Sequence, residues 1–164
     1  MMLRKFLARA AGVGTVMVQY GCIAHCTLEY VSDIVICSGP SMLPTIHPGD
    51  IVLTDHITVA RGLIRKGDIV IVKSPTNPKQ QICKRVAGVA GDIVQDPPPH
   101  FSYKYVPRGH VWLRGDNSEN SSDSREYGPV PIALIRSRVM YKIWPIPDIG
   151  TLKSKERIAK GNYR

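Results

Sequence analysis

The spacing of apolar residues divides the chain into two parts near residue 33. Between Ala10 and Leu28 there is no Asp, Glu, Lys or Arg, and this length is close to the roughly 20 residues that a helix needs to cross a bilayer. Arg4, Lys5 and Arg9 precede the stretch, and basic residues tend to stay on the side from which a segment inserts. We therefore expect residues 1–33 to form a basic segment and a single membrane anchor helix.

Two other interpretations of this stretch remain open on the sequence alone. Glycines and polar residues such as Thr15 and Gln19 weaken its apolar character, and a buried core helix would show a similar pattern. The residues before Ala10 are basic and contain no acid, which is also typical of a cleaved targeting peptide.

From residue 34 onward, short apolar runs rich in β-branched residues alternate with Gly, Pro and Asp. Such runs, each bounded by turn residues, are typical of an all-β domain, which we expect over residues 34–150. The expected strands are Ile34–Cys37, Ile51–Thr54, Ile69–Val72, Ile82–Ala87, Ile93–Gln95, His110–Leu113 and Val139–Trp144. A short helix or turn is expected at Ile132–Arg136, and residues 151–164 are expected to be a basic, flexible tail.

Charge and cysteine content narrow the classes of partner and site that we expect for the chain. The chain has 164 residues and a formal net charge of +9, which raises the question of nucleic-acid binding. Because the basic residues gather at the two ends and no aromatic stripe accompanies the others, we expect no nucleic-acid partner. No Cys and His residues have the spacing of a zinc site, so we expect no metal and no cofactor.

One candidate for chemistry is Ser41, within the segment Ser38–Thr45. Its glycine and two prolines exclude a regular helix or strand ladder, so Ser41 is held on a shaped turn at the end of an expected strand. A catalytic nucleophile needs this kind of presentation. An ordinary loop would have the same composition.

A second candidate is Lys84, which interrupts the apolar run Ile82–Ala87. A lysine in such a strand usually lies on the solvent side. If it pointed inward, burial would lower the pKa of the amine, and a neutral lysine can act as the general base for a serine. Because strand residues alternate, Lys84 and Arg85 face opposite sides and one of them could be inside. Ile82 and Val86 share the face of Lys84.

A third stretch, Arg114–Arg125, is dense in Ser, Asn and Asp. A polar surface loop is one interpretation. The other is a buried loop that orients a catalytic lysine through a Ser hydroxyl and an Asp–Arg pair.

Together the three stretches resemble the type I signal peptidase family. The similar residues are Gly39–Thr45, Lys84–Val86 with Gly88–Asp92, and Gly115–Ser121 with Asp123–Arg125 and Gly128. They occur in the family's order over roughly residues 34–145. The resemblance implies a mainly β fold of coiled antiparallel sheets with one N-terminal membrane helix. Within the family, these sequence motifs are most similar to those of the animal form of the mitochondrial inner membrane branch.

The resemblance implies a role for each matching residue. Ser41 corresponds to the nucleophile and Lys84 to the general base. Ser121 corresponds to the serine that orients the lysine, and Asp123 and Arg125 correspond to the pair that braces its loop.

Residues around the expected base would keep it dry. Met42 matches a methionine that the family packs near the base, and Ile82 and Val86 are its neighbours along the strand. The backbone N–H of Ser41 would serve the oxyanion hole. Some bacterial members place a serine two positions before the nucleophile, where this chain has Gly39.

Two cysteines lie beside these stretches. Cys37 precedes Ser38 and Cys83 adjoins Lys84, which points to thiol sensitivity. The sequence gives no basis for pairing them.

The resemblance also implies an activity, partners and a location. The expected activity is that of a membrane-bound serine endopeptidase that removes N-terminal sorting or signal peptides from precursor proteins delivered to the mitochondrial inner membrane and intermembrane space. It implies a heterodimer with a second, related protease subunit, contact with inner-membrane lipid, and a catalytic domain facing the intermembrane space. The alternative is a non-catalytic basic β-domain that binds anionic lipid or nucleic acid.

Overall fold

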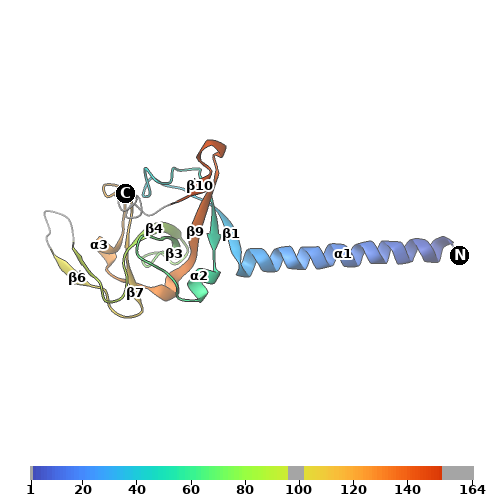
Figure 1. Cartoon of the computed structure of the whole chain (residues 1–164), viewed down its shortest axis with the longest axis horizontal. Helices are drawn as coiled ribbons and strands as arrows, with labels where there is room; N and C mark the ends of the chain where they lie inside the picture. Colours follow the sequence, from blue (N-terminus) through green and yellow to red (C-terminus); the bar gives the residue numbers. More distant parts are fainter. Residues whose placement is uncertain (1, 96–101, 153–164) are drawn as a thin grey trace, which may run out of the picture.

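The computed structural model describes residues 2–95 and 102–152. A single long helix, α1 (Met2–Tyr30), projects from a body made of β-strands, as Figure 1 shows. The uncharged stretch Ala10–Leu28 lies wholly within α1, and the described α1 side chains from Gly12 onward are exposed. Among residues 2–95 and 102–152, no helix combines the length and the apolarity that crossing a membrane requires.

The body is mainly antiparallel β-sheet, as the sequence predicted. Eight strands form one sheet in the order β1-β2-β9-β3-β4-β7-β8, with β10 paired to β9. These strands are β1 (Ser32–Ile36), β2 (Ile51–Asp55), β3 (Ile69–Lys73), β4 (Gln81–Gly88), β7 (His110–Arg114), β8 (Val130–Pro131), β9 (Ile135–Trp144) and β10 (Gly150–Thr151). A second, two-stranded sheet pairs β5 (Ile93–Gln95) with β6 (Tyr103–Tyr105).

Short helical turns connect the strands. They are α2 (Ile57–Ala60), α3 (Ser124–Tyr127) and the 3₁₀ turns η1 (Ile132–Leu134) and η2 (Ile146–Asp148). Each of the seven expected strands overlaps an observed one, whereas β6, β8 and β10 were not expected. The stretch expected as a short helix, Ile132–Arg136, divides between η1 and the first residues of β9. Of the expected tail, Thr151 belongs to β10, and residues 153–164 lie outside the described residues.

Two hydrophobic clusters cover opposite faces of the central strands. The first contains Cys37, Met42, Ile46, Val52, Ile69, Ile71 and Val139. The second contains Val70, Val72, Val86, Val111, Leu113, Val130 and Ile135. Because alternate residues of β3 enter different clusters, all four of its residues from Ile69 to Val72 are buried.

The two clusters also cover both faces of the neighbouring strand β4. Alternation placed Lys84 and Arg85 on opposite faces of the strand, so that one of them could be inside. In the structure Lys84 is only 3% exposed and the Arg85 side chain only 11%. Both are withdrawn from water because both faces of the sheet are covered, and each of them therefore needs polar partners.

Candidate active site

Ser41 lies on a tight turn between β1 and β2. The turn is closed by backbone hydrogen bonds from Leu43 N to Pro40 O and from Ile46 N to Met42 O. Met42 and Ile46 are buried in the first cluster and hold the turn against the body, while Ser41 itself is half-buried. Within the described residues, the Ser41 backbone N–H donates no hydrogen bond.

Lys84 projects from β4, opposite Val70 of β3. Its Nζ donates a 2.7 Å hydrogen bond to Ser121 Oγ. Burial lowers the pKa of Lys84 below its ordinary value, although the charge of Asp123 acts in the opposite direction. A buried amine with a lowered pKa has the property that a lysine general base requires.

A second buried lysine shows what distinguishes Lys84. Lys142 Nζ lies 2.5 Å from Asp50 Oδ2, and each of the two side chains is 6% exposed. The ammonium of Lys142 is committed to this ion pair. Lys84, by contrast, forms no ion pair among the described residues, so its amine can be uncharged without breaking one.

Ser121, Asp123 and Arg125 extend the contacts of Lys84 into a chain of hydrogen bonds. Ser121 Oγ donates to Asp123 Oδ2 over 3.2 Å, and Arg125 Nε donates to Asp123 Oδ1 over 2.8 Å. The backbone N–H groups of Gly115 and Arg125 also donate to this carboxylate. Burial alone would raise the pKa of Asp123, but these hydrogen bonds hold it below its usual value. The carboxylate is therefore ionised and fixes the direction of the Ser121 hydroxyl.

Gly115 brings the Ser41 turn and the Ser121 loop into contact. A Cβ at this position would lie 2.2 Å from Ser121 Oγ and 2.6 Å from the backbone oxygen of Ser41. The next residues add a tether, because Asn117 N donates to Ser41 O over 3.0 Å. Asn117 Nδ2 also donates to Pro40 O over 3.2 Å. Only glycine allows the backbone of Ser41 and the hydroxyl that binds Lys84 to approach so closely.

The structure thus joins Lys84, Ser121, Asp123 and Arg125 through side-chain bonds, and Ser41 through its backbone. No hydrogen bond links Ser41 Oγ with Lys84 Nζ in the part of the chain that is described. Catalytic hydrogen bonds are often longer before a substrate binds than in the reacting complex, so this arrangement is compatible with a serine–lysine pair.

The three residues expected to keep the lysine dry do not share one cluster. Met42 is buried in the first cluster, with Cys83 packed against it. Val86 is buried in the second cluster, and Ile82 packs against that cluster. Ile82, Lys84 and Val86 share one face of β4, so the second cluster is the apolar surface on the lysine's side of the sheet.

Three further residues tie the site together and were not predicted. Arg85 Nε donates to Asp116 Oδ1 over 2.7 Å, and Arg85 Nη2 donates to Asp116 Oδ2 over 2.6 Å. Thr45 Oγ1 donates to the same carboxylate. The network links the strand of the base, the loop after β7 and the end of the nucleophile turn. All three residues lie in the stretches that resemble the family, but nothing in the sequence indicated that they contact one another.

Two histidine rings are bonded to backbone carbonyl oxygens. The ring of His56 bonds to Arg136 O and that of His110 to Arg108 O. His100 lies outside the described residues. No group of three or more His, Cys, Asp or Glu side chains lies together as metal ligands would within residues 2–95 and 102–152.

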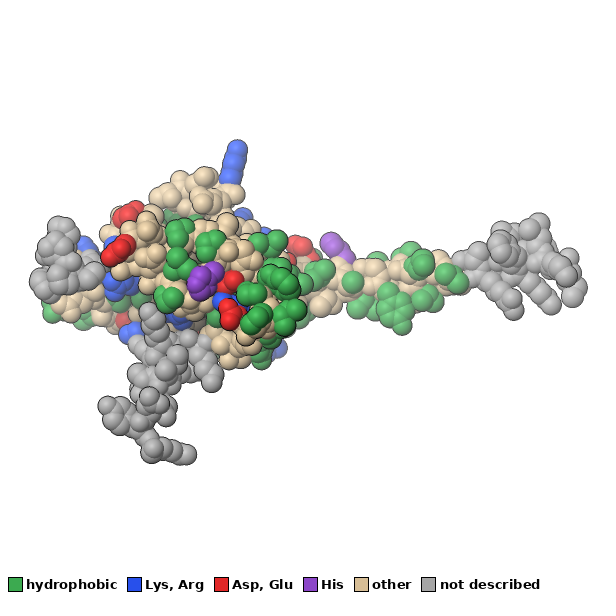
Figure 2. All heavy atoms as spheres, turned by 90° about the horizontal axis from the view of Figure 1, so that it is seen from above, with side chains coloured by type: hydrophobic (Ala, Val, Ile, Leu, Met, Phe, Trp, Pro, Cys, Tyr) green, Lys and Arg blue, Asp and Glu red, His purple; other side chains and the backbone are tan. Residues whose placement is uncertain are grey.

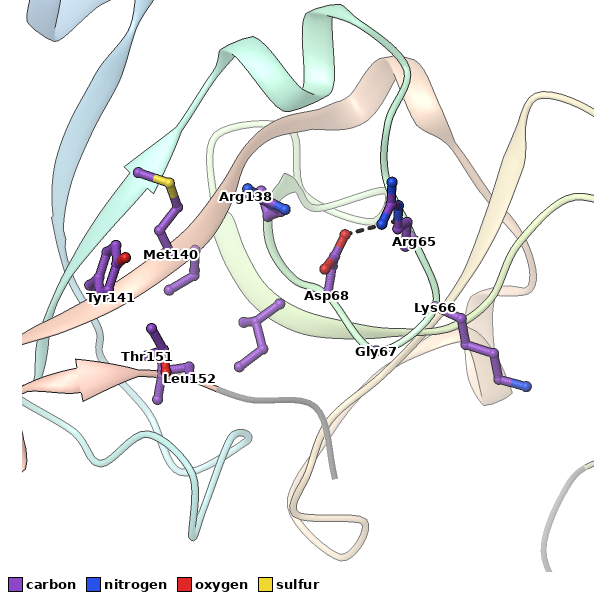
Figure 3. A pocket seen from close by; sticks show the side chains of 11 residues that line it. Arg65, Lys66, Gly67, Asp68, Arg138, Met140, Tyr141, Thr151 and Leu152 are labelled. Carbon is purple, nitrogen blue, oxygen red and sulfur yellow. Dashed lines mark hydrogen bonds between the residues drawn. The ribbon is translucent and has the colours of Figure 1, made fainter. Parts of the chain in front are cut away.

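A hollow of about 380 Å³ lies elsewhere on the body, between β9, β10 and the turn before β3. Figure 3 shows it, with Arg65, Asp68, Arg138 and Tyr141 among the side chains at its wall. Asp68 accepts a hydrogen bond from the backbone N–H of Arg65, and Arg138 is paired with Asp55. None of the expected catalytic residues lines this hollow, so it is separate from the candidate active site.

Comparison with known proteins shows the family to which the chain belongs. The profile of the family described as "Signal peptidase, peptidase S26" matches residues 10–98 and 95–144. The chain belongs to this family and is therefore a serine-type peptidase. This confirms the resemblance seen in the three sequence stretches.

Individual relatives show which members of the family this chain is similar to. Human mitochondrial inner membrane protease subunit 1 is 53% identical over 156 residues, which cover 93% of this chain and 94% of the relative. Subunit 2 of the mouse mitochondrial inner membrane protease is 38% identical over 128 residues, covering 75% of this chain and 73% of that protein. A solved signal peptidase I from Enterococcus faecalis is 21% identical, with a TM-score of 0.39 over 46% of this chain and 95% of the other.

Proposed function

We propose that the chain is a membrane-attached serine endopeptidase in which Ser41 is the nucleophile and Lys84 the general base. The observation that carries this proposal is the buried amine of Lys84, with its lowered pKa and its 2.7 Å hydrogen bond to Ser121 Oγ. A neutral amine has one lone pair. Because an N–H of Lys84 is directed to Ser121, the lone pair remains available for the proton of Ser41.

The reaction follows from these positions. Ser41 Oγ attacks the carbonyl carbon of the scissile bond while Lys84 Nζ takes its proton. The Ser41 N–H donates to the oxyanion that forms. The resulting ammonium of Lys84 protonates the leaving amine. The neutral amine that results then takes a proton from the water that hydrolyses the acyl-enzyme, and it returns this proton to Ser41 Oγ as the acyl group leaves. Ser121, oriented by Asp123, keeps the amine in place through both steps.

The edge of β4 beside Lys84 supports binding of an extended substrate. β7 pairs with β4 only from Arg85 onward, and β3 occupies the other edge. In the described part of the chain, no strand therefore pairs with the β7-side edge of Gln81–Lys84. A peptide can add to such an edge by main-chain hydrogen bonds. We propose that the substrate binds here as a strand, with its scissile bond beside Lys84.

The proposed substrates are precursor proteins delivered to the mitochondrial inner membrane and intermembrane space, from which the enzyme removes N-terminal sorting peptides. The names of the relatives support this location. The relationship to both subunit 1 and subunit 2 proteins supports a heterodimer with a second, related subunit.

The helix α1 is the proposed membrane attachment, with the catalytic body facing the intermembrane space. Its basic beginning and its uncharged stretch support this orientation. Hydrophobic side chains are exposed along α1, and Figure 2 shows that they continue onto the part of the body next to the helix. Ile34 and Ile36 of β1, 53% and 69% exposed, lie directly after the helix. Such a surface fits contact with inner-membrane lipid.

The test is cleavage of a presequence-bearing precursor by the full chain, with its partner subunit present. Ser41→Ala and Lys84→Arg should each abolish cleavage, because the arginine side chain stays protonated and cannot act as a base. Lys73→Arg is the matched control, since Lys73 is an exposed lysine at the end of β3. Full activity of the Lys84→Arg variant would exclude the serine–lysine mechanism.

A further inference from the structure

Two cysteines that the proposed mechanism does not use lie in contact beside the site. Cys37 directly follows β1, and Cys83 belongs to β4. Cys83 packs against the hydrophobic cluster of which Cys37 is a buried member, and both are free thiols. Cys37 is buried at 8% exposure, while Cys83 is partly exposed. The sequence suggested thiol sensitivity at these positions but gave no reason to pair them.

The contact joins two strands that stand at opposite ends of a run in the sheet. In the run β1-β2-β9-β3-β4, the strands β1 and β4 are the first and the last. Cys37 continues the pairing of β1, because its N–H donates to Asp50 O and its carbonyl accepts from Gly49 N. The two thiols can meet only if the sheet curls until its β1 end returns to β4. We call Cys37 and the free edge of Gln81–Lys84, taken together, the seam.

The seam lies within the proposed catalytic region. Cys83 immediately precedes Lys84, and Cys37 begins the segment that leads to Ser41. Cys83 packs against the cluster that contains both Cys37 and Met42. The free edge on which the substrate is proposed to add forms one side of the seam. This part of the argument rests on the proposed function.

We propose that Cys37 and Cys83 form an oxidation site, and that a disulfide between them closes the seam and prevents a peptide substrate from binding. The oxidant would be a small-molecule disulfide such as oxidised glutathione. One thiolate attacks it to give a mixed disulfide and one glutathione thiolate. The second cysteine then attacks the protein sulfur and releases the second glutathione. Two protein thiols lose two electrons and two protons, and one oxidised glutathione becomes two reduced molecules.

The chemistry of the pair favours this exchange. The hydrogen bond with Cys83 holds the pKa of Cys37 below its ordinary value, although burial acts against it. Thiolate is the nucleophilic form in disulfide exchange. A partner thiol already in contact can then resolve the mixed disulfide without a large rearrangement.

A disulfide and a bound substrate strand would exclude each other on geometric grounds. The Cα atoms of a disulfide are roughly 4.4–6.8 Å apart. A strand inserted between two others separates them by two spacings of about 4.8 Å, or about 9.6 Å in all. The reduced pair can separate to admit the peptide, and the oxidised pair cannot. Because a bound peptide would hold the two thiols apart, it should slow oxidation of the pair.

The experiment compares the full chain, reduced and after treatment with oxidised glutathione. We expect mass spectrometry to detect an intramolecular Cys37–Cys83 cross-link, and presequence cleavage to fall in proportion to the cross-linked fraction. Dithiothreitol should restore activity. A non-cleavable presequence peptide should slow cross-linking. Cleavage by Cys37→Ser or Cys83→Ser should not respond to the oxidant.

The cysteines of α1 provide the matched control. Cys22 and Cys26 are exposed on the helix, away from the seam, so the double variant Cys22→Ser/Cys26→Ser should respond to the oxidant as the unchanged chain does. Absence of the Cys37–Cys83 cross-link would overturn the inference, as would a cross-linked chain with full activity. A reduced chain that cleaves no presequence would instead overturn the proposed function and, with it, the effect assigned to the disulfide.

Discussion

Lys84 Nζ reaches Ser121 Oγ at 2.7 Å across 37 residues of sequence, and this bond fixes the direction of the lysine amine. Ser121 is held in turn by the ionised carboxylate of Asp123. The orientation of the proposed base therefore depends on a loop that belongs to another part of the chain.

Ser121→Ala should reduce kcat by about 10²-fold with little change in KM, because a misplaced catalytic group costs rate rather than binding. Steady-state kinetics on a presequence peptide measure this split. The neighbouring Ser122 is exposed and bonds to Glu126 rather than to the lysine. Ser122→Ala should therefore keep the activity of the unchanged chain. Equal losses in the two variants would contradict the role of Ser121.

Lys84→Met should increase the free energy of unfolding at neutral pH by on the order of 1 kcal/mol, while it abolishes cleavage. The folded state lowers the pKa of Lys84 from 10.5, so the unfolded chain binds more protons between the lowered value and 10.5. Stability of the unchanged chain therefore rises with pH through this window. Denaturant unfolding at several pH values should show the advantage of Lys84→Met shrinking as the pH rises.

The other buried lysine is the control for that measurement. Lys142→Met removes the partner of Asp50 and leaves an uncompensated buried carboxylate. It should destabilise the fold by about 3–5 kcal/mol. Lys84→Met and Lys142→Met would thus change the free energy of unfolding in opposite directions. If both destabilised the protein equally, Lys84 would be a structural lysine rather than one whose charged form the fold disfavours.

Gly115→Ala should destabilise the protein by about 1–3 kcal/mol, because the new methyl group would overlap Ser121 and the carbonyl of Ser41. Cleavage should fall as well, since both segments must move apart. Thermal unfolding and peptide cleavage check the two effects. Gly150→Ala is the control, because nothing lies within 4 Å of a Cβ there. An active and stable Gly115→Ala variant would show that the contact is unimportant.

Asp116→Asn should cost about 3–5 kcal/mol of stability, because the buried guanidinium of Arg85 loses its charged partner. Thr45→Val should cost about 1 kcal/mol by removing one hydrogen bond to the same carboxylate. A double-mutant cycle should give a coupling energy of about 0.5–3 kcal/mol between them. The exposed Glu119, changed to Gln, is the control in the same loop. Strictly additive effects would mean that Thr45 and Asp116 do not form one unit.

Local pattern carried the prediction of most strands. β3 and β4 are largely apolar runs between turn residues, and this pattern is typical of strands. β6 did not, because Tyr103–Tyr105 is exposed throughout and its pairing with Ile93–Gln95 is the only reason that it is a strand. The split of Ile132–Arg136 between η1 and β9 depends likewise on pairing with β3.

Candidate residues were found where they matched a family motif, and missed where a distant partner defines them. Lys84 was singled out because it interrupts an apolar run. The burial of Arg85 beside it follows from the second face of the sheet being covered, which no strand-by-strand pattern contains. The hydrogen bond between Thr45 and Asp116, 71 residues apart, and the thiol contact of Cys37 with Cys83 likewise exist only through the curl of the sheet.

The placement of α1 has a consequence for protein engineering. Among the described residues, every member of the two hydrophobic clusters lies at Cys37 or later, and a hydrogen bond from His56 N to Val31 O helps to tie the start of β1 to the body. Under the proposed function, tethering and bond cleavage belong to separate parts of the chain. A chimera that joins a foreign tether at Val31 would retain the peptidase chemistry, and the length of that junction would set how far above the lipid surface a precursor is cut.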